Sequence, residues 1–128
     1  MKDPRFDFRV LVVEDEILIR KYVNLLLESV GCTIVGETAY AERAIPLARE
    51  KSPDLILMDI RLKGDMDGVE AAKEISRHSN AAILFMSAYD YQKRVEALQL
   101  PNTLGYLKKP LEDYELKPYL ERLAEKTA

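Results

Sequence analysis

Residues 53–59 read PDLILMD, and this stretch decides the fold of the 128-residue chain. Four consecutive apolar residues, Leu55 to Met58, stand between two acidic ones. Because successive side chains of a β-strand point to opposite faces of the sheet, an unbroken apolar run indicates a strand that is buried on both faces. Residues Ile83 to Met86 have the same character. Two such runs predict the central strands of a parallel sheet that helices cover on each side.

Short apolar runs recur along the chain at intervals of 22 to 28 residues, and their markers are Val10, Ile34, Ile56, Leu84 and Tyr106. Each interval has room for one crossover helix, which is the pattern of βαβ units rather than of hairpins. The sequence therefore predicts an α/β fold, a doubly wound parallel sheet of five strands with five helices. We expect one domain over residues 1–128, with an ordered core from about 8 to 126.

Helical periodicity fills the intervals between the predicted strands. Ile19, Val23 and Leu27 share one helix face, and Gly31 is expected to end this first helix. Pro46 is expected to kink or shorten the second helix, because proline removes a backbone donor. The other three helices are expected from apolar residues at helical spacing, which are Val69, Ala72 and Ile75, then Val95 and Leu98, then Leu116, Tyr119, Leu120 and Leu123.

The composition narrows the class of protein. Nineteen basic and 22 acidic residues give a net charge of −3, so we expect neither direct nucleic-acid binding nor binding to an anionic membrane. No apolar stretch approaches the about 20 residues of a membrane span, and the first residues lack the apolar core of a signal peptide. A cytoplasmic location is expected. Cys32, the single cysteine, is expected to be a small hydrophobic residue at a strand edge rather than a reactive thiol.

Acidic residues follow two of the predicted strands, where ligands of doubly wound sheets bind. Glu14, Asp15 and Glu16 follow the first strand and Asp59 follows the third. Like charges about 4 Å apart repel by about 4 kcal/mol at an effective dielectric near 20, so converging acids either have raised pKa values or bind a cation. Oxygen ligands without a nearby His or Cys favour Mg²⁺. The alternative is that these acids only cap the following helices.

The fourth and fifth strands are followed by Ser87 and by Lys109. A carboxylate beside Mg²⁺, with a hydroxyl and an ammonium on adjacent strands, suits transient aspartyl phosphate chemistry. Asp59 is the candidate nucleophile, and Lys109 is the candidate partner of the phosphate and the carboxylate.

Five motifs, in this order and spacing, resemble the receiver domain of bacterial response regulators over nearly the whole chain. They are Val12-Val13-Glu14-Asp15-Glu16, Pro53 to Asp59, Met66-Asp67-Gly68, Met86-Ser87-Ala88 and Lys109-Pro110. The resemblance implies a flavodoxin-like strand order of 2-1-3-4-5. It also implies a cis peptide bond between Lys109 and Pro110. Lys63, where the family usually has proline, and a loop at residues 64–68 that is one residue longer depart from the family pattern.

The resemblance assigns expected roles to the residues at the strand ends. Asp59 corresponds to the phosphoacceptor. Mg²⁺ is expected to bind Asp59, the acidic pair Glu14 and Asp15, and the backbone carbonyl of Arg61. Phosphate binding and switching are expected from the remaining matched positions, which are Ser87, Ala88, Lys109 and, as the switch aromatic, Tyr106.

As a function, the resemblance implies a signalling phosphoacceptor that catalyses only its own phosphorylation and dephosphorylation. The phosphoryl group would come from the phosphohistidine of a sensor histidine kinase or phosphotransfer protein. The output surface would be the face of the fourth helix, fifth strand and fifth helix, where an unknown downstream protein, an output domain or a second copy in a homodimer would bind. Its expected residues are Tyr89, Tyr91, Leu107 and Tyr114, and the alternative is that these are ordinary surface residues.

Two other function classes share some of these features. A hydrolase of the haloacid-dehalogenase type also uses an aspartate nucleophile and Mg²⁺, but it has an acid where this chain has Arg61, and 128 residues leave no room for a cap domain. A receiver-like module that does not take phosphate is disfavoured by the intact set of Glu14, Asp15, Asp59, Ser87 and Lys109. No output domain follows Lys126, so we expect either a stand-alone receiver or a piece of a longer protein.

Overall fold

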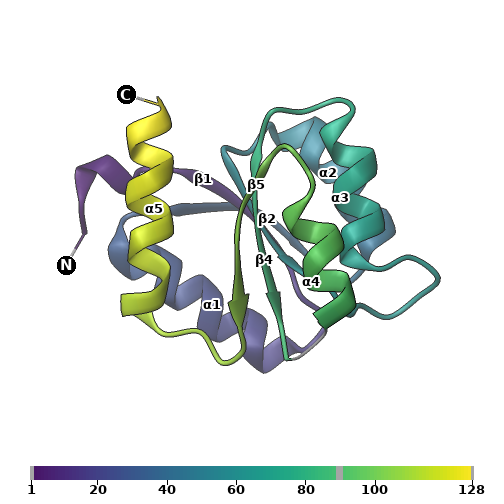
Figure 1. Ribbon diagram of the computed structural model, residues 1–128. Coiled ribbons are helices and arrows are strands. Elements are labelled where there is room, and N and C mark those ends of the chain that lie inside the picture. Colours follow the sequence, from purple (N-terminus) through teal and green to yellow (C-terminus); the bar gives the residue numbers. More distant parts are fainter. Residues whose placement is uncertain (1, 89–90, 128) are drawn as a thin grey trace.

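A computed structural model describes residues 2–88 and 91–127. It contains a five-stranded parallel sheet with strand order β2-β1-β3-β4-β5, which confirms the predicted fold class and topology (Figure 1). The strands are β1 (Arg9–Val13), β2 (Thr33–Thr38), β3 (Leu55–Asp59), β4 (Ala82–Ser87) and β5 (Thr103–Lys108).

Five α-helices cover the two faces of the sheet. They are α1 (Ile17–Val30), α2 (Ala41–Lys51), α3 (Gly68–Ser76), α4 (Tyr91–Leu98) and α5 (Asp113–Thr127), and a 3₁₀ turn at Pro4–Phe6 precedes β1. Helices α1 and α5 lie on one face, and α2, α3 and α4 lie on the other (Figure 1). The sheet therefore separates two hydrophobic cores.

The central strands are buried on both faces, as predicted. In β3, Leu55 and Leu57 pack in the core under α1 and α5, and Ile56 and Met58 pack in the core under α2, α3 and α4. Asp59 pairs with Met86 of β4 at the end of the strand. The continuous apolar run thus fixes the central strand and brings Asp59 to the carboxyl edge of the sheet.

Pro46 does not shorten α2. The helix runs for 11 residues from Ala41 to Lys51 with Pro46 inside it. Pro46 and Glu42, whose carbonyl loses its usual donor at position 46, are both exposed, so water can satisfy that carbonyl. The expectation that Pro46 shortens the helix was wrong, because the proline lies on an exposed side of the helix. The alternative expectation, a kink at Pro46, stays a prediction.

The buried face of α4 and one expected surface residue also differ from the prediction. Val95 and Leu98 are 43% and 48% exposed, whereas Ala97 is fully buried. Leu107 is buried in the core under α1 and α5, because its neighbour Tyr106 faces α4 and successive strand residues alternate. Tyr114 is exposed as expected. The expectation for Tyr89 lies outside the described residues, as does the expectation for the side chain of Tyr91.

Two other predictions from the sequence are confirmed. Gly31 ends α1 with a φ of 122°, a backbone conformation that glycine adopts without steric cost. Cys32 is buried just before the edge strand β2, and burial raises the pKa of its thiol to about 11. A buried neutral thiol is a packing residue rather than a nucleophile.

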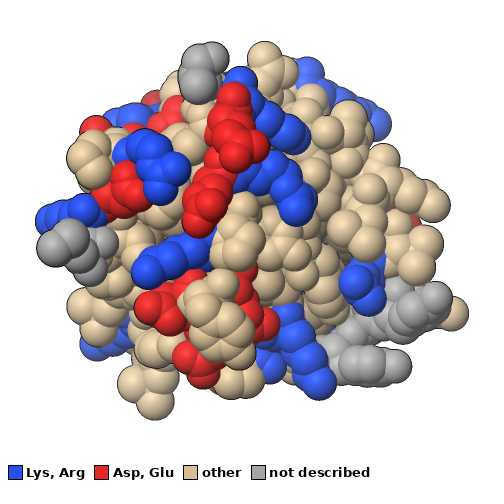
Figure 2. Space-filling view, turned by 60° about the vertical axis from the view of Figure 1, so that its left-hand side comes forward, with Lys and Arg blue, Asp and Glu red and all other residues tan. Residues whose placement is uncertain are grey.

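Charges of both signs are interspersed on the molecular surface that Figure 2 presents. That face carries no extensive field of one sign. Within the described parts of the chain, none of the helices combines the length and the apolar character that are needed to span a bilayer.

Candidate phosphoacceptor site

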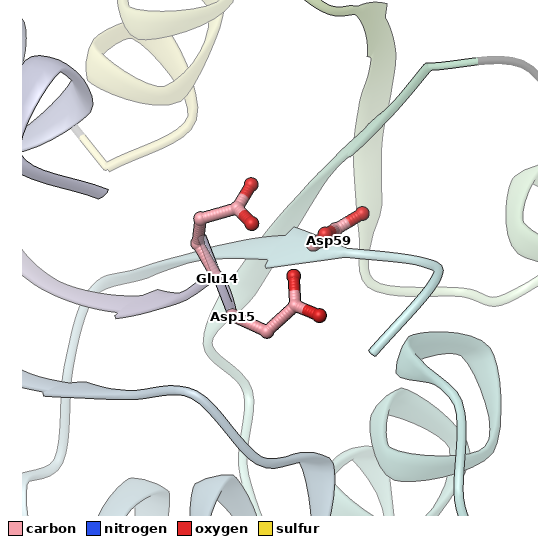
Figure 3. A group of neighbouring side chains, drawn as sticks. All are labelled: Glu14, Asp15 and Asp59. Carbon is pink, nitrogen blue, oxygen red and sulfur yellow. The ribbon is translucent and has the colours of Figure 1, made fainter. Parts of the chain in front are cut away.

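Three carboxylates converge where β1 and β3 end. Glu14 and Asp15 directly follow β1, and Asp59 is the last residue of β3. One carboxylate oxygen from each of the three lies within 4.8 Å of the others (Figure 3). The two strands are neighbours in the sheet and run parallel, so their carboxyl ends meet at one edge. The convergence expected from the sequence is therefore present.

Lys109 joins this cluster from the end of β5. Its Nζ lies 2.8 Å from Asp59 Oδ2 and 2.5 Å from Glu14 Oε1. Its backbone N–H donates to the carbonyl of Ser87 at 2.8 Å, which continues the pairing of β4 with β5 beyond the strand end. The peptide bond between Lys109 and Pro110 is cis, as predicted.

The site holds more negative than positive charge in a buried setting. Glu14 is fully buried and Asp59 is 2% exposed. Burial raises the pKa of Glu14 to about 7 despite the hydrogen bond from Lys109. Burial also raises the pKa of Asp59, against the opposing effect of Lys109. For Lys109, burial acts to lower the pKa, but the partners Asp59 and Glu14 raise it above its ordinary value.

This donor set fits a hard divalent cation. Three carboxylates and one ammonium leave a net negative charge when ionised, and oxygen ligands are those that Mg²⁺ prefers. The chain's one histidine and one cysteine lie elsewhere, with His78 exposed just beyond α3 and Cys32 before β2. A bound cation would let both buried acids ionise, which their raised pKa values otherwise oppose.

Each oxygen of the Asp59 carboxylate has a donor. Oδ1 accepts a hydrogen bond from the backbone N–H of Arg61 at 3.2 Å, and Oδ2 accepts one from Lys109. The Arg61 backbone thus lies against Asp59, although the predicted role of its carbonyl stays a prediction. Ser87 is the last residue of β4 and follows Met86, which pairs with Asp59. Its fully buried hydroxyl has no hydrogen-bond partner among the described residues. An unpaired buried hydroxyl is costly, so this one is available to a ligand. Ala88, which follows it, is exposed.

The loop between β3 and α3, which departs from the family pattern, is tied to its surroundings. The backbone of Lys63 forms an isolated parallel β-bridge with that of Tyr40. The Glu42 carboxylate accepts a hydrogen bond from the Met66 N–H at 3.2 Å. At the end of the loop, Gly68 packs so closely on Asp59 that an added Cβ would lie 2.0 Å from the Asp59 carbonyl oxygen. From the sequence, Gly68 was expected only as a loop residue, because the one signal of this packing is a glycine at the start of a helix.

Tyr106 lies on β5, half-buried against the core under α4. The guanidinium carbon of Arg94, from α4, lies 5.3 Å from the centre of its ring. This distance is within the range of a cation–π interaction. The contact of Arg94 was not predicted, because nothing in the sequence around an exposed helical arginine indicates which residue it contacts.

Beside the site is a groove of about 490 Å³ that extends from Lys109 along α1. Pro110, Ile19 and Tyr22 are among the residues that line it. The Tyr22 hydroxyl donates to the carbonyl of Leu111 at 2.8 Å, which fixes α1 against the segment after β5. This groove was not predicted from the sequence, because only the buried face of α1 could be recognised there.

Comparison with known proteins places these features in a family. The model of the response regulator receiver domain matches residues 10–121. The transcriptional regulatory protein PdtaR of Mycobacterium tuberculosis is 36% identical over 113 residues, which are 88% of this chain and 55% of that protein. YdfI of Bacillus subtilis, also a transcriptional regulatory protein, is 35% identical over 79% of this chain and 47% of its own length. The chain spans about half the length of these curated relatives.

Solved structures agree with this assignment. The signal receiver domain of a modulated diguanylate cyclase from Desulfovibrio desulfuricans G20 superposes with a TM-score of 0.85 at 33% identity, covering 94% of this chain and 95% of that one. A two-component response regulator of the LuxR family from Aurantimonas sp. SI85-9A1 gives a TM-score of 0.82 at 28% identity, covering 94% and 86% of the two chains. Matched over most of its length in sequence and fold, the chain belongs to the response regulator receiver domain family.

Proposed function

We propose that residues 1–128 form one receiver domain in which Asp59 accepts a phosphoryl group from the phosphohistidine of a sensor kinase or phosphotransfer protein. The observation that carries this proposal is the placement of the buried Asp59 carboxylate within hydrogen-bond distance of Lys109 and close to Glu14 and Asp15. A lone buried acid would stay protonated, whereas Lys109 lowers the pKa of this one and the two further acids offer oxygen ligands to a cation.

In the transfer step, an oxygen of Asp59 attacks the phosphorus of the donor. The bond between phosphorus and the imidazole nitrogen breaks, and its electron pair stays with that nitrogen. Mg²⁺, held by Glu14, Asp15, Asp59 and the carbonyl of Arg61, would when bound neutralise the carboxylate and phosphoryl oxygens together. Lys109 then moves its hydrogen bond from the carboxylate to a phosphoryl oxygen.

The residues after β4 complete the phosphate contacts in this proposal. The Ser87 hydroxyl, buried and without a described partner, donates to a second phosphoryl oxygen, and the adjacent Ala88 backbone lies beside it. Inward movement of Ser87 leaves room for Tyr106 to rotate from its position under Arg94. The surface of α4, β5 and α5 would then change when Asp59 is phosphorylated.

The groove beside Lys109 is where we propose that the phosphodonor protein binds. It opens next to the site and is lined mainly by apolar side chains. Along the same helix, Leu18 and Leu25 are 79% and 68% exposed. Exposed apolar residues that adjoin a reactive site suit an apolar partner surface, so the donor's histidine could reach Asp59 from this side.

Phosphorylation of variants tests the proposal. The protein is incubated with a phosphorylated kinase or a small phosphodonor in MgCl₂, and intact-protein mass spectrometry counts phosphoryl adducts. We expect one adduct on the wild type, none on Asp59→Asn and one on Asp65→Asn, an exposed control acid in the neighbouring loop. Chelation of Mg²⁺ should abolish the adduct. Labelling of Asp59→Asn at the wild-type level would refute the assignment, and an unlabelled wild type would favour a module that does not take phosphate.

A further inference from the structure

Arg20 lies one turn into α1, and its guanidinium reaches back to the end of β1. Its Nη1 donates to the carbonyl oxygen of Glu14 at 2.7 Å, and its Nε donates to Glu37 Oε1 at 2.9 Å. The side chain is only 16% exposed. The guanidinium therefore links α1 to the ends of two strands.

The partners of Arg20 are held in turn. Asn24, one turn further along α1, donates from Nδ2 to Glu37 Oε2 at 3.0 Å. Both oxygens of the Glu37 carboxylate are thus engaged, which restrains the orientation of the guanidinium. On the other side of Glu14, its backbone N–H donates to the Thr38 carbonyl at 3.0 Å. The backbone of Glu14 is fixed through both its N–H and its C=O groups.

We propose that Arg20 is a positioning residue for the acidic pair. By holding the Glu14 carbonyl, it sets the direction in which Glu14 and the next residue, Asp15, project toward Asp59, and thereby the affinity of the site for a divalent cation. This inference rests on the proposed function, because it requires Mg²⁺ to bind at these carboxylates. Partners that orient metal ligands typically change metal affinity by about 10- to 100-fold when they are removed.

The sign of the effect separates positioning from simple charge. A guanidinium beside a cation site repels the cation, so removal of its charge alone would tighten Mg²⁺ binding. Removal of a positioning contact would weaken binding, because Glu14 and Asp15 would no longer be held in place. Opposite directions are expected from the two roles, so a single titration can distinguish them.

The test is a titration with MgCl₂ followed by calorimetry or by NMR. We expect Arg20→Gln to weaken Mg²⁺ binding by about tenfold. Arg20→Lys keeps the charge but loses the planar guanidinium, whose donors contact two partners at once. This variant should also bind Mg²⁺ more weakly than the wild type. Arg49→Gln is the control, because Arg49 is exposed on α2 beside residues that precede β3, at the other end of the sheet. Arg49→Gln should bind Mg²⁺ like the wild type. Equal midpoints of thermal unfolding in the wild type and the variants would show that the change in Mg²⁺ affinity does not come from a loss of fold.

Binding by Arg20→Gln that equals or exceeds that of the wild type would overturn the inference. If Arg20→Gln fails to fold, Arg20→Lys becomes the deciding variant. An affinity of Arg20→Lys for Mg²⁺ equal to that of the wild type would then overturn the inference. A wild type that binds Mg²⁺ while the variants do not differ contradicts only the role of Arg20. A wild type that binds no Mg²⁺ contradicts the proposed function itself, and the inference with it.

Discussion

The centre of the site is one ammonium shared by two buried carboxylates. Lys109 contacts both Asp59 and Glu14, and neither acid has appreciable contact with solvent. When both carboxylates are ionised, their charge exceeds that of the one ammonium, and an uncompensated buried charge has a large desolvation cost. The same mismatch makes the site responsive to a cation or a phosphoryl group, either of which changes the local charge.

Replacement of Lys109 by Met should destabilise the protein in a pH-dependent way. The pKa of Glu14 in the folded protein, about 7, is above its ordinary value of 4.5, so the folded state binds more protons in this range and stability falls as pH rises. Without Lys109 the pKa values of both acids rise further and the loss extends to higher pH. Urea unfolding in EDTA should show that Lys109→Met lowers the free energy of unfolding by about 3–5 kcal/mol at pH 8. The decrease at pH 5 should be smaller. Lys108→Met, an exposed neighbour, is the control, and a penalty independent of pH would contradict this account.

At the scale of elements, the strands were easier to predict than the faces of the helices. The unbroken apolar runs of β3 and β4 predict strands that are buried on both faces, and they are buried in the structure. Asp59 and Ser87 could therefore be placed at strand ends from the sequence. Helix α4 is short, and Ala97 faces the core where Val95 and Leu98 were expected. A small residue contributes little to an apolar pattern, yet it lets a helix approach the sheet closely. Leu107 could have been placed correctly from strand alternation with Tyr106.

The junction of β3 and α3 requires glycine at position 68, because a side chain there would not fit. An added Cβ would lie 2.0 Å from the Asp59 carbonyl oxygen and 2.9 Å from Met58 Cγ. Because the closer atom belongs to the backbone of Asp59, Gly68→Ala must displace Asp59. We expect a loss of about 1–3 kcal/mol in unfolding free energy together with slower phosphorylation. In the control Gly36→Ala, the nearest atom is a side-chain carbon of Leu11 at 3.3 Å, so a smaller loss and normal phosphorylation are expected. Equal effects of the two substitutions would argue against a special role for Gly68.

At the scale of the whole molecule, the parallel sheet places the carboxyl ends of all five strands at one edge. This topology could be predicted from the sequence, and with it the convergence of Glu14, Asp15, Asp59 and Lys109. The contacts that orient these side chains could not be predicted. In the sequence, Arg20 on an amphipathic helix has the pattern of a surface residue, and only the structure shows that it contacts Glu14 and Glu37. The same holds for Arg94 and Tyr106, which are 12 residues apart and meet only in the folded chain.

Phosphorylation should therefore be detectable far from Asp59. A full switch from 1:99 to 99:1 requires a bias of about 5.5 kcal/mol toward the active form, and the contact of Arg94 with Tyr106 opposes it by about 0.5–1 kcal/mol. With Mg²⁺ and a beryllofluoride mimic, NMR shifts should extend from Asp59 through Ser87 to Tyr106 and α4. Shifts confined to the acidic cluster and the loop after β3 would contradict the proposed switch.

Direct localisation of the phosphoryl group tests the central claim, which is that the strand ends form one Mg²⁺-dependent site with Asp59 as the acceptor. The phosphorylated protein is reduced with borohydride, which converts an acyl phosphate into an alcohol, and its peptides are sequenced by tandem mass spectrometry. We predict homoserine at position 59 and at no other aspartate, with a yield that falls to background in EDTA. Homoserine at another position, or the same yield at position 59 without Mg²⁺, would contradict the account.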